Sequence, residues 1–134
     1  MTHGDMLWAD SAPSRQIDSE LLLRCIEACF DCAQACAECA DACLSDPAVA
    51  DLTECIRSDL DCADMCEATG RLLSRFTGDD TNLTRAFLDT CAAACRTCAA
   101  ECERHASTHA HCAACAEACR RCEETCEALL AALA

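Results

Sequence analysis

The sequence has little positive charge and no long apolar run, and both deficits exclude whole classes of function. Ten basic residues stand against 24 acidic ones, which gives a formal net charge of −14 in a chain of 134 residues. Such a surface repels nucleic acid and anionic membranes, so neither is expected as a partner. No stretch approaches the roughly 18 consecutive apolar residues that a membrane-spanning helix needs. The length predicts a single domain.

Two further patterns are missing. Residues 1–19 contain no basic segment followed by an apolar one and no twin arginine, so no export signal is expected. The predicted location is therefore the cytoplasm, where thiols stay reduced. Alternation of apolar and polar residues over four or more positions is also absent, which argues against β-strands.

Cysteine is what the sequence has in excess. There are eighteen cysteines, most of them spaced alternately three and four residues apart. Because an α-helix turns once per 3.6 residues, this spacing places the thiols in one stripe, the a/d seam of a helix bundle. Neighbours along such a stripe are about 5 to 6 Å apart at Cβ, whereas a disulfide needs about 3.5 to 4.5 Å. The predicted metal-binding cysteines are Cys25, Cys29, Cys32, Cys36, Cys39, Cys43, Cys55, Cys62, Cys66, Cys91, Cys95, Cys98, Cys102, Cys112, Cys115, Cys119, Cys122 and Cys126.

The cysteine runs divide the chain into four predicted helices with short breaks between them. The first helix is expected to begin between Ser14 and Ser19 and to end near Leu44. Asp46 and Pro47 suit the cap and first turn of the second helix, which is expected to end near residue 76. The third helix is expected to end near residue 105, and the fourth runs to the C-terminus. Gly78 is expected as the C′ residue after the second helix. The expected N-cap of the third helix is Asp80 or Thr81, and that of the fourth helix is Ser107 or Thr108.

Short connections make consecutive helices antiparallel neighbours. The predicted fold is therefore all-α, an antiparallel up-down-up-down four-helix bundle with a cysteine-lined core. Residues 1–18 are assigned to an N-terminal leader with room for a short helix, and residues 19–134 to the bundle. In this arrangement the larger apolar residues meet at one end of the bundle as a hydrophobic plug. They are Leu22, Leu72, Leu73, Phe76, Leu83, Phe87, Leu88, Leu129, Leu130 and Leu133.

The opposite end of the predicted bundle carries histidine. The seam of the third helix continues past its thiols to His105, and the seam of the fourth begins at His109. Imidazole and thiol groups at an unplugged end predict a metal entrance, with His105 and His109 as ligands. His111 and His3 lie off the seam and are assigned to the surface.

Thiolates are soft ligands that select Cu(I), Zn(II) or iron-sulfur clusters. If each Cu(I) displaces one thiol proton, about one copper per cysteine leaves the charge of a dry core unchanged. Zinc in separate tetrathiolate sites leaves net negative charge, and the seam carries no lysine or arginine to offset it. Charge therefore favours multiple Cu(I) ions, although bridging sulfurs would weaken the argument against zinc. The alternatives are a metallothionein-like Zn(II) or Cd(II) buffer and a thiol redox protein that uses the CxxC pairs.

Three segments, CIEACFDCAQACAECADAC, CAAACRTCAAEC and CAACAEACRRCEETC, resemble the bacterial four-helix-bundle copper storage proteins, and the chain resembles their cytosolic branch. The resemblance implies non-enzymatic storage of many Cu(I) ions, a homotetramer, and metal entrance through the histidine-bearing end. The other expected partners are copper donor or acceptor proteins. One departure is Asp59, which occupies the seam between Cys55 and Cys62, so the second helix offers fewer thiols.

Overall fold

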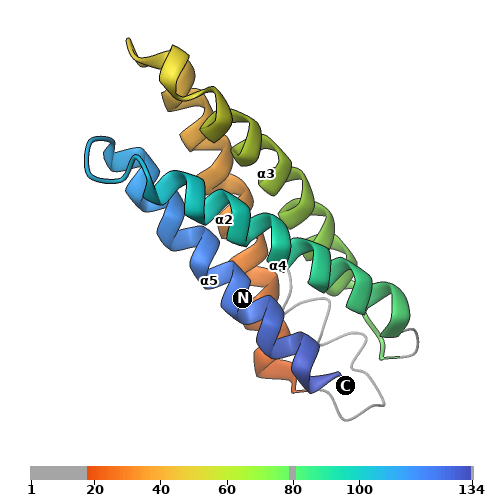
Figure 1. Ribbon diagram of the computed structural model, residues 1–134. Coiled ribbons are helices and arrows are strands. Elements are labelled where there is room, and N and C mark those ends of the chain that lie inside the picture. The colour runs from red at the N-terminus through yellow and green to blue at the C-terminus, as the bar shows by residue number, and fades with distance from the viewer. Residues whose placement is uncertain (1–17, 79–80, 134) are drawn as a thin grey trace.

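The computed structural model describes residues 18–78 and 81–133, which form four α-helices and one short 3-10 helix (Figure 1). No strand occurs in these ranges, so the all-α prediction is confirmed. In the same ranges, no helix has the length and apolar character needed to cross a membrane. The leader predicted for residues 1–18 lies outside the described residues except for Asp18. The elements are α2 (Ser19–Leu44), η1 (Val49–Asp51), α3 (Thr53–Ser74), α4 (Thr81–Glu103) and α5 (Ala110–Ala132).

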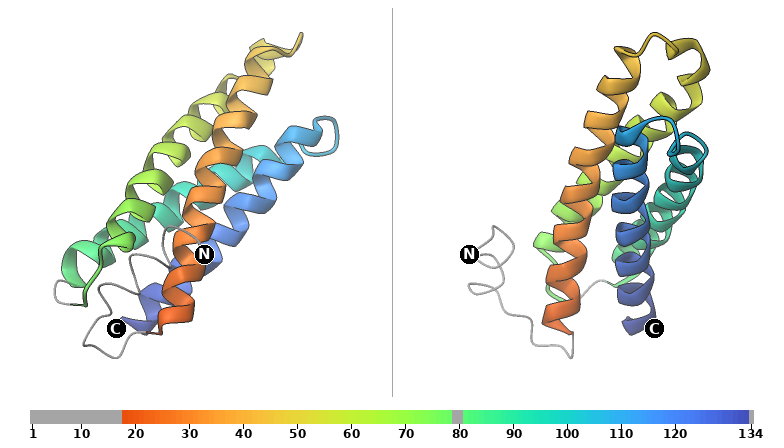
Figure 2. Two further views of the ribbon diagram at one scale, coloured as in Figure 1. Left: turned by 180° about the vertical axis from the view of Figure 1, so that it is seen from behind. Right: turned by 90° about the vertical axis from the view of Figure 1, so that its left-hand side faces the viewer.

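The helices run up and down in sequence order. Helix α2 packs against α3 and α5, and α4 packs against the same two helices. Figure 2 shows the α2–α3 and α4–α5 connections at one end of the bundle, which we call the open end. The α3–α4 connection lies at the other end, the closed end. This is the predicted antiparallel bundle.

The helix starts differ in detail from the sequence prediction. Helix α2 begins as expected, because the Asp18 side chain accepts a hydrogen bond from the Leu21 backbone N–H at 3.1 Å. Helix α3 begins at Thr53, later than predicted. The carboxylate of Asp46 instead accepts the Ala48 N–H at 2.7 Å, which closes a turn ahead of η1. The extra turn brings Leu52, only 1% exposed, into the core before α3 starts.

The cap residues predicted for the other two connections also differ from those in the structure. Gly78 adopts a positive φ of 92°, but it lies beyond Arg75, the C-cap of α3, and so shapes the connection rather than the helix end. Helix α4 is described from Thr81 onward, and the alternative cap Asp80 lies outside the described residues. The N-cap of α5 is His109, not Ser107 or Thr108. Its extended backbone, φ −135° and ψ 107°, turns the chain into α5.

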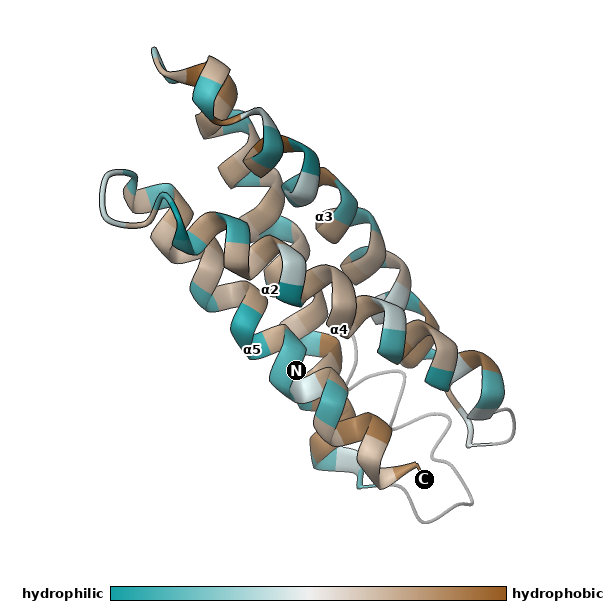
Figure 3. Ribbon diagram, viewed as in Figure 1, coloured by the Kyte–Doolittle hydropathy of each residue, from teal (hydrophilic) through white to brown (hydrophobic). Residues whose placement is uncertain are grey.

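The hydrophobic plug is confirmed in its main members. Leu22, Leu73, Phe76, Leu88 and Leu129 are buried at the closed end, one or more from each helix. Figure 3 shows apolar residues where α5 finishes. The prediction that Leu83 belongs to the plug is wrong, because this residue is 49% exposed. Leu83 lies one residue before the buried Thr84, so it faces away from the bundle axis.

Gly70 allows α2 and α3 to approach closely. A Cβ atom built on Gly70 would lie 2.9 Å from Cζ of Phe30, inside van der Waals contact. The Phe30 ring therefore occupies the space that a side chain at position 70 would need. Helix α3 continues through this glycine to Ser74. Glycine costs helix stability at this position, but its lack of a side chain leaves room for the Phe30 ring.

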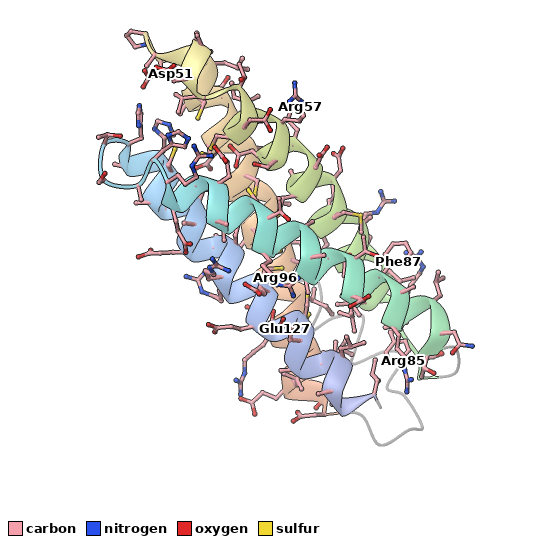
Figure 4. The ribbon with its side chains drawn as sticks, viewed as in Figure 1. Asp51, Arg57, Arg85, Phe87, Arg96 and Glu127 are labelled. Atoms are coloured by element: carbon pink, nitrogen blue, oxygen red, sulfur yellow. The ribbon has the colours of Figure 1, made fainter. Side chains whose placement is uncertain are left out.

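Ion pairs join α4 and α5 across the bundle surface. The Arg96 guanidinium lies 3.0 Å from carboxylate oxygens of both Glu123 and Glu127, and Figure 4 shows Arg96 and Glu127 directed toward each other. Arg120 of α5 pairs in turn with Glu103 of α4 at 2.8 Å. Because these groups are largely exposed, they favour the antiparallel register without dominating stability.

Candidate metal-binding core

All eighteen cysteine side chains point into the bundle. Each is free, and each is only 0 to 1% exposed. Helix α2 contributes six of them, and α3, α4 and α5 supply the rest, so the predicted thiol-lined core is present. A seam of this kind replaces the leucines of an ordinary bundle by small polarisable groups that can also bind soft metals.

The sulfur atoms form a continuous column along the bundle axis. Near the closed end, Sγ of Cys25 lies 3.8 Å from Sγ of Cys126. In the middle, Sγ of Cys66 lies 3.5 Å from Sγ of Cys95 on the adjacent helix. Near the open end, Sγ of Cys55 lies 3.6 Å from Sγ of Cys102. Thiols from different helices are thus close enough to share metal ions along the whole column.

Within the column, ligand atoms gather into groups whose members all lie within 4.8 Å of one another. Adjacent groups share sulfurs: Cys122 belongs to two of them, as do Cys32, Cys36 and Cys119. Such sharing suits bridging thiolates better than isolated tetrahedral sites. Five of the seven groups, from the closed to the open end, are Cys29, Cys91, Cys122 and Cys126; Cys32, Cys66, Cys95 and Cys122; Cys32, Cys36, Cys62 and Cys119; Cys36, Cys98, Cys115 and Cys119; and Cys39, Cys43, His111 and Cys112.

Asp59 places one carboxyl group inside the thiol column. It is fully buried, and Oδ1 accepts hydrogen bonds from the thiols of Cys98, Cys115 and Cys102 at 3.1, 3.4 and 3.5 Å. Burial raises the pKa of Asp59 far above its usual range. The carboxyl is therefore protonated at neutral pH in the metal-free protein. The seam position predicted for Asp59 is correct.

Burial also holds protons on two thiols at the open end, those of Cys43 and Cys112. Desolvation raises the pKa of Cys43 to about 12, and it raises the pKa of Cys112 as well. A dry core disfavours charged thiolates unless a cation accompanies them. Each cation that enters must therefore displace protons, and metal binding is linked to proton release.

The two predicted histidines lie at the open end, where each pairs with a carboxylate. Nε2 of His105 lies 3.0 Å from the Glu101 carboxylate, one turn earlier on α4. Nε2 of His109 lies 3.2 Å from the Asp46 carboxylate, which joins the α4–α5 connection to the α2–α3 connection. The rings of His105 and His109 meet edge to face, with centroids 6.2 Å apart. Both imidazoles are half-buried.

The histidine that reaches the thiols is His111, which the sequence analysis wrongly assigned to the surface. Its Nε2 lies 3.4 Å from Sγ of Cys43, and its ring meets that of His109 at a centroid distance of 5.4 Å. His105, His109 and His111 thus form a row that ends on a thiol. The missed signal was spacing, because His111 stands four residues before Cys115 and shares its side of α5.

This architecture is found in proteins already known. The sequence profile of the copper storage protein family, Csp, matches residues 18–131. The chain is also 38% identical over 88 residues to the uncharacterized cysteine-rich protein YhjQ of Bacillus subtilis, a match that spans 66% of this chain and 76% of the relative.

Solved structures agree with the sequence matches. The Streptomyces lividans copper storage protein Ccsp, loaded with 10 copper equivalents, superimposes with a TM-score of 0.92 and 58% identity over 97% of this chain and 98% of the other. A further structure, of a cytosolic copper storage protein from the same organism with five coppers, gives a TM-score of 0.82 and 62% identity over 84% and 93% of the two chains. Cu(I)-bound BsCsp3, a copper storage protein, gives a TM-score of 0.70 and 37% identity over 78% and 93%. With the cysteine column, the bundle topology and the profile match in agreement, this chain belongs to the copper storage protein family.

Proposed function

We propose that this chain stores Cu(I) in the cytoplasm, bound to its eighteen cysteines at about one copper per cysteine. The observation that carries the proposal is the unbroken sulfur column, in which thiols of all four helices lie 3.5 to 4.0 Å from their neighbours inside a core closed to solvent. Each Cu(I) that binds forms a copper–thiolate bond and releases the thiol proton to the solvent. The core then fills without accumulating charge.

The cytoplasmic location is supported by the family and by the S. lividans relative described as cytosolic. Storage rather than catalysis is supported by burial, because reactive cysteines in redox enzymes are partly exposed to their substrates. Here every thiol is at most 1% exposed, so a protein disulfide has no route to the CxxC pairs.

Copper is proposed to enter at the open end along the histidine row. His105 and His109 would receive the ion from solvent, and His111 would pass it to Cys43, 3.4 Å away. The carboxylates of Glu101 and Asp46 beside the first two imidazoles add local negative potential that attracts a cation. A copper donor or acceptor protein would dock at this end.

We also propose assembly into a homotetramer, as the family resemblance implies. Phe30 on α2 is 37% exposed although its ring is held against Gly70, so it offers a rigid apolar contact. Sedimentation analysis at micromolar concentration tests this. A monomer under those conditions would contradict it.

Anaerobic titration of the reduced protein with Cu(I), in competition with a Cu(I) chelator, tests the storage proposal. Saturation is expected near the cysteine count of eighteen. Saturation by only about four or five Zn(II), with tighter retention of zinc than of copper, would instead support a zinc buffer. Turnover of a disulfide substrate would support a redox enzyme.

A further inference from the structure

Thr69 is a buried polar residue that the thiol column does not account for. It lies five residues before the end of α3, is 0% exposed, and its Oγ1 has no hydrogen-bond partner among the residues that the structure describes. Buried hydroxyl groups are normally paired, and a helical threonine commonly donates to a carbonyl one turn earlier. A buried hydroxyl without a partner therefore needs an explanation.

Three other hydroxyl groups in these helices follow the usual pattern. Ser58 donates to the Glu54 carbonyl at 3.0 Å, Ser74 to the Gly70 carbonyl at 2.7 Å, and Thr125 to the Cys122 carbonyl at 3.0 Å. Thr69 makes no such bond to its own helix. Its hydroxyl hydrogen remains available to an acceptor that arrives later.

The position of Thr69 identifies that acceptor. Thr69 lies one turn beyond Cys66 toward the closed end, and Sγ of Cys66 is 3.8 Å from Sγ of Cys91. Its neighbour Gly70 faces the ring of Phe30, which sets Thr69 level with Cys29 on α2. At this level lie the thiols of the closed-end group Cys29, Cys91, Cys122 and Cys126, and Thr69 follows Cys66 by three residues on the same side of α3.

We propose that Thr69 is a positioning residue for copper at the closed end: its hydroxyl donates a hydrogen bond to a thiolate of this closed-end group when Cu(I) occupies it. A protonated thiol is a weak acceptor, whereas a thiolate carries charge and makes a stronger hydrogen bond. The contact is thus made only in the loaded state, and it favours that state. Direct coordination of the hydroxyl is disfavoured, because Cu(I) prefers sulfur to oxygen.

This inference rests on the proposed storage function, and two substitutions test it. Thr69→Val keeps the shape of the side chain and removes the hydroxyl, whereas Thr69→Ser keeps the hydroxyl and removes a methyl group. Each reduced, metal-free variant is compared with wild type by thermal unfolding. Each is then titrated anaerobically with Cu(I) against a chelator.

Thr69→Val is expected to unfold at or above the wild-type temperature without metal, because it removes an unpaired buried polar group. The copper ions that this variant binds most weakly should be held on the order of tenfold less tightly than in wild type. Thr69→Ser should retain wild-type copper affinity while unfolding at a slightly lower temperature. A crystal structure of the loaded protein should bring Oγ1 of Thr69 within hydrogen-bond reach of a thiolate sulfur.

Identical copper binding by wild type and Thr69→Val would overturn the inference and leave the storage function intact. Destabilisation of metal-free Thr69→Val would also overturn it, because the hydroxyl would then already have a partner such as buried water. Failure of the wild-type protein to bind Cu(I) near the cysteine count would instead overturn the storage function itself.

Discussion

The Asp59 carboxyl lies 3.1 Å from Sγ of Cys98, so an acid is held among thiols where solvent cannot reach it. Burial raises the pKa of Asp59, and the folded protein therefore keeps a proton that the unfolded chain loses above about pH 4. The stability contributed by this proton is present at low pH and is lost as the pH rises. The slope approaches about 1.4 kcal/mol per pH unit.

Asp59→Asn should remove this dependence. Chemical denaturation of the reduced, metal-free protein at several values between about pH 5 and 8 should show a smaller fall in unfolding free energy than in wild type. Asp61→Asn, an exposed position two residues along α3, is the matched control and should retain the wild-type slope. Parallel curves for wild type and Asp59→Asn would mean that Asp59 is ionised in the folded state.

Leu88→Ala should destabilise the bundle without changing its copper capacity. Leu88 is fully buried in the plug, and loss of such a side chain costs about 2 to 5 kcal/mol. Leu83→Ala, on the exposed side of the same helix, should cost less than about 0.5 kcal/mol. Denaturant unfolding of the metal-free variants measures both effects. Equal losses at the two positions would contradict the packing described for the closed end.

Gly70 and Phe30 should show strong energetic coupling. Alanine at position 70 gains about 1 kcal/mol of helix propensity, but its Cβ collides with the Phe30 ring. Gly70→Ala should therefore be neutral or destabilising in wild type and stabilising by about 1 kcal/mol in a Phe30→Ala background. A double-mutant cycle followed by urea unfolding measures the coupling. Additive effects would show that the ring moves aside freely.

The three histidines should differ in whether they affect the rate of copper loading or the affinity for copper. His105→Ala combined with His109→Ala should slow copper loading severalfold while capacity stays the same, since these rings pair with the carboxylates of Glu101 and Asp46. His111→Ala should lower affinity for copper in the group it shares with Cys39, Cys43 and Cys112. Stopped-flow loading and chelator competition measure rate and affinity separately. Unchanged rates in the double variant would exclude the proposed entrance.

The bundle was predictable because cysteine spacing carries the same helical period that leucine carries in ordinary bundles. The 4-3-4-3 pattern indicated which face of every helix is buried, and the polar breaks indicated antiparallel neighbours. The buried position of Asp59 followed from the same period, as did most of the hydrophobic plug. These features depend on local periodicity, which the sequence displays directly.

The features that were missed depend on contacts between segments. The late start of α3 follows from burial of Leu52, which a capping argument at Asp46 does not include. The approach of His111 to Cys43 depends on how the α4–α5 connection folds over the end of α2. Likewise, the free hydroxyl of Thr69 appears only when its neighbours are in place. A single-helix pattern contains none of this information.

The shared sulfurs of the column have a consequence for how metal is held. Cys32, Cys36, Cys119 and Cys122 each belong to two adjacent groups, so a metal ion bound in one of these linked groups shares ligands with the next. When one ion leaves, the thiolates that it shared become available to its neighbours, and these ions are expected to rearrange. The linked groups are therefore expected to hold copper as one polynuclear reservoir rather than as a row of separate compartments.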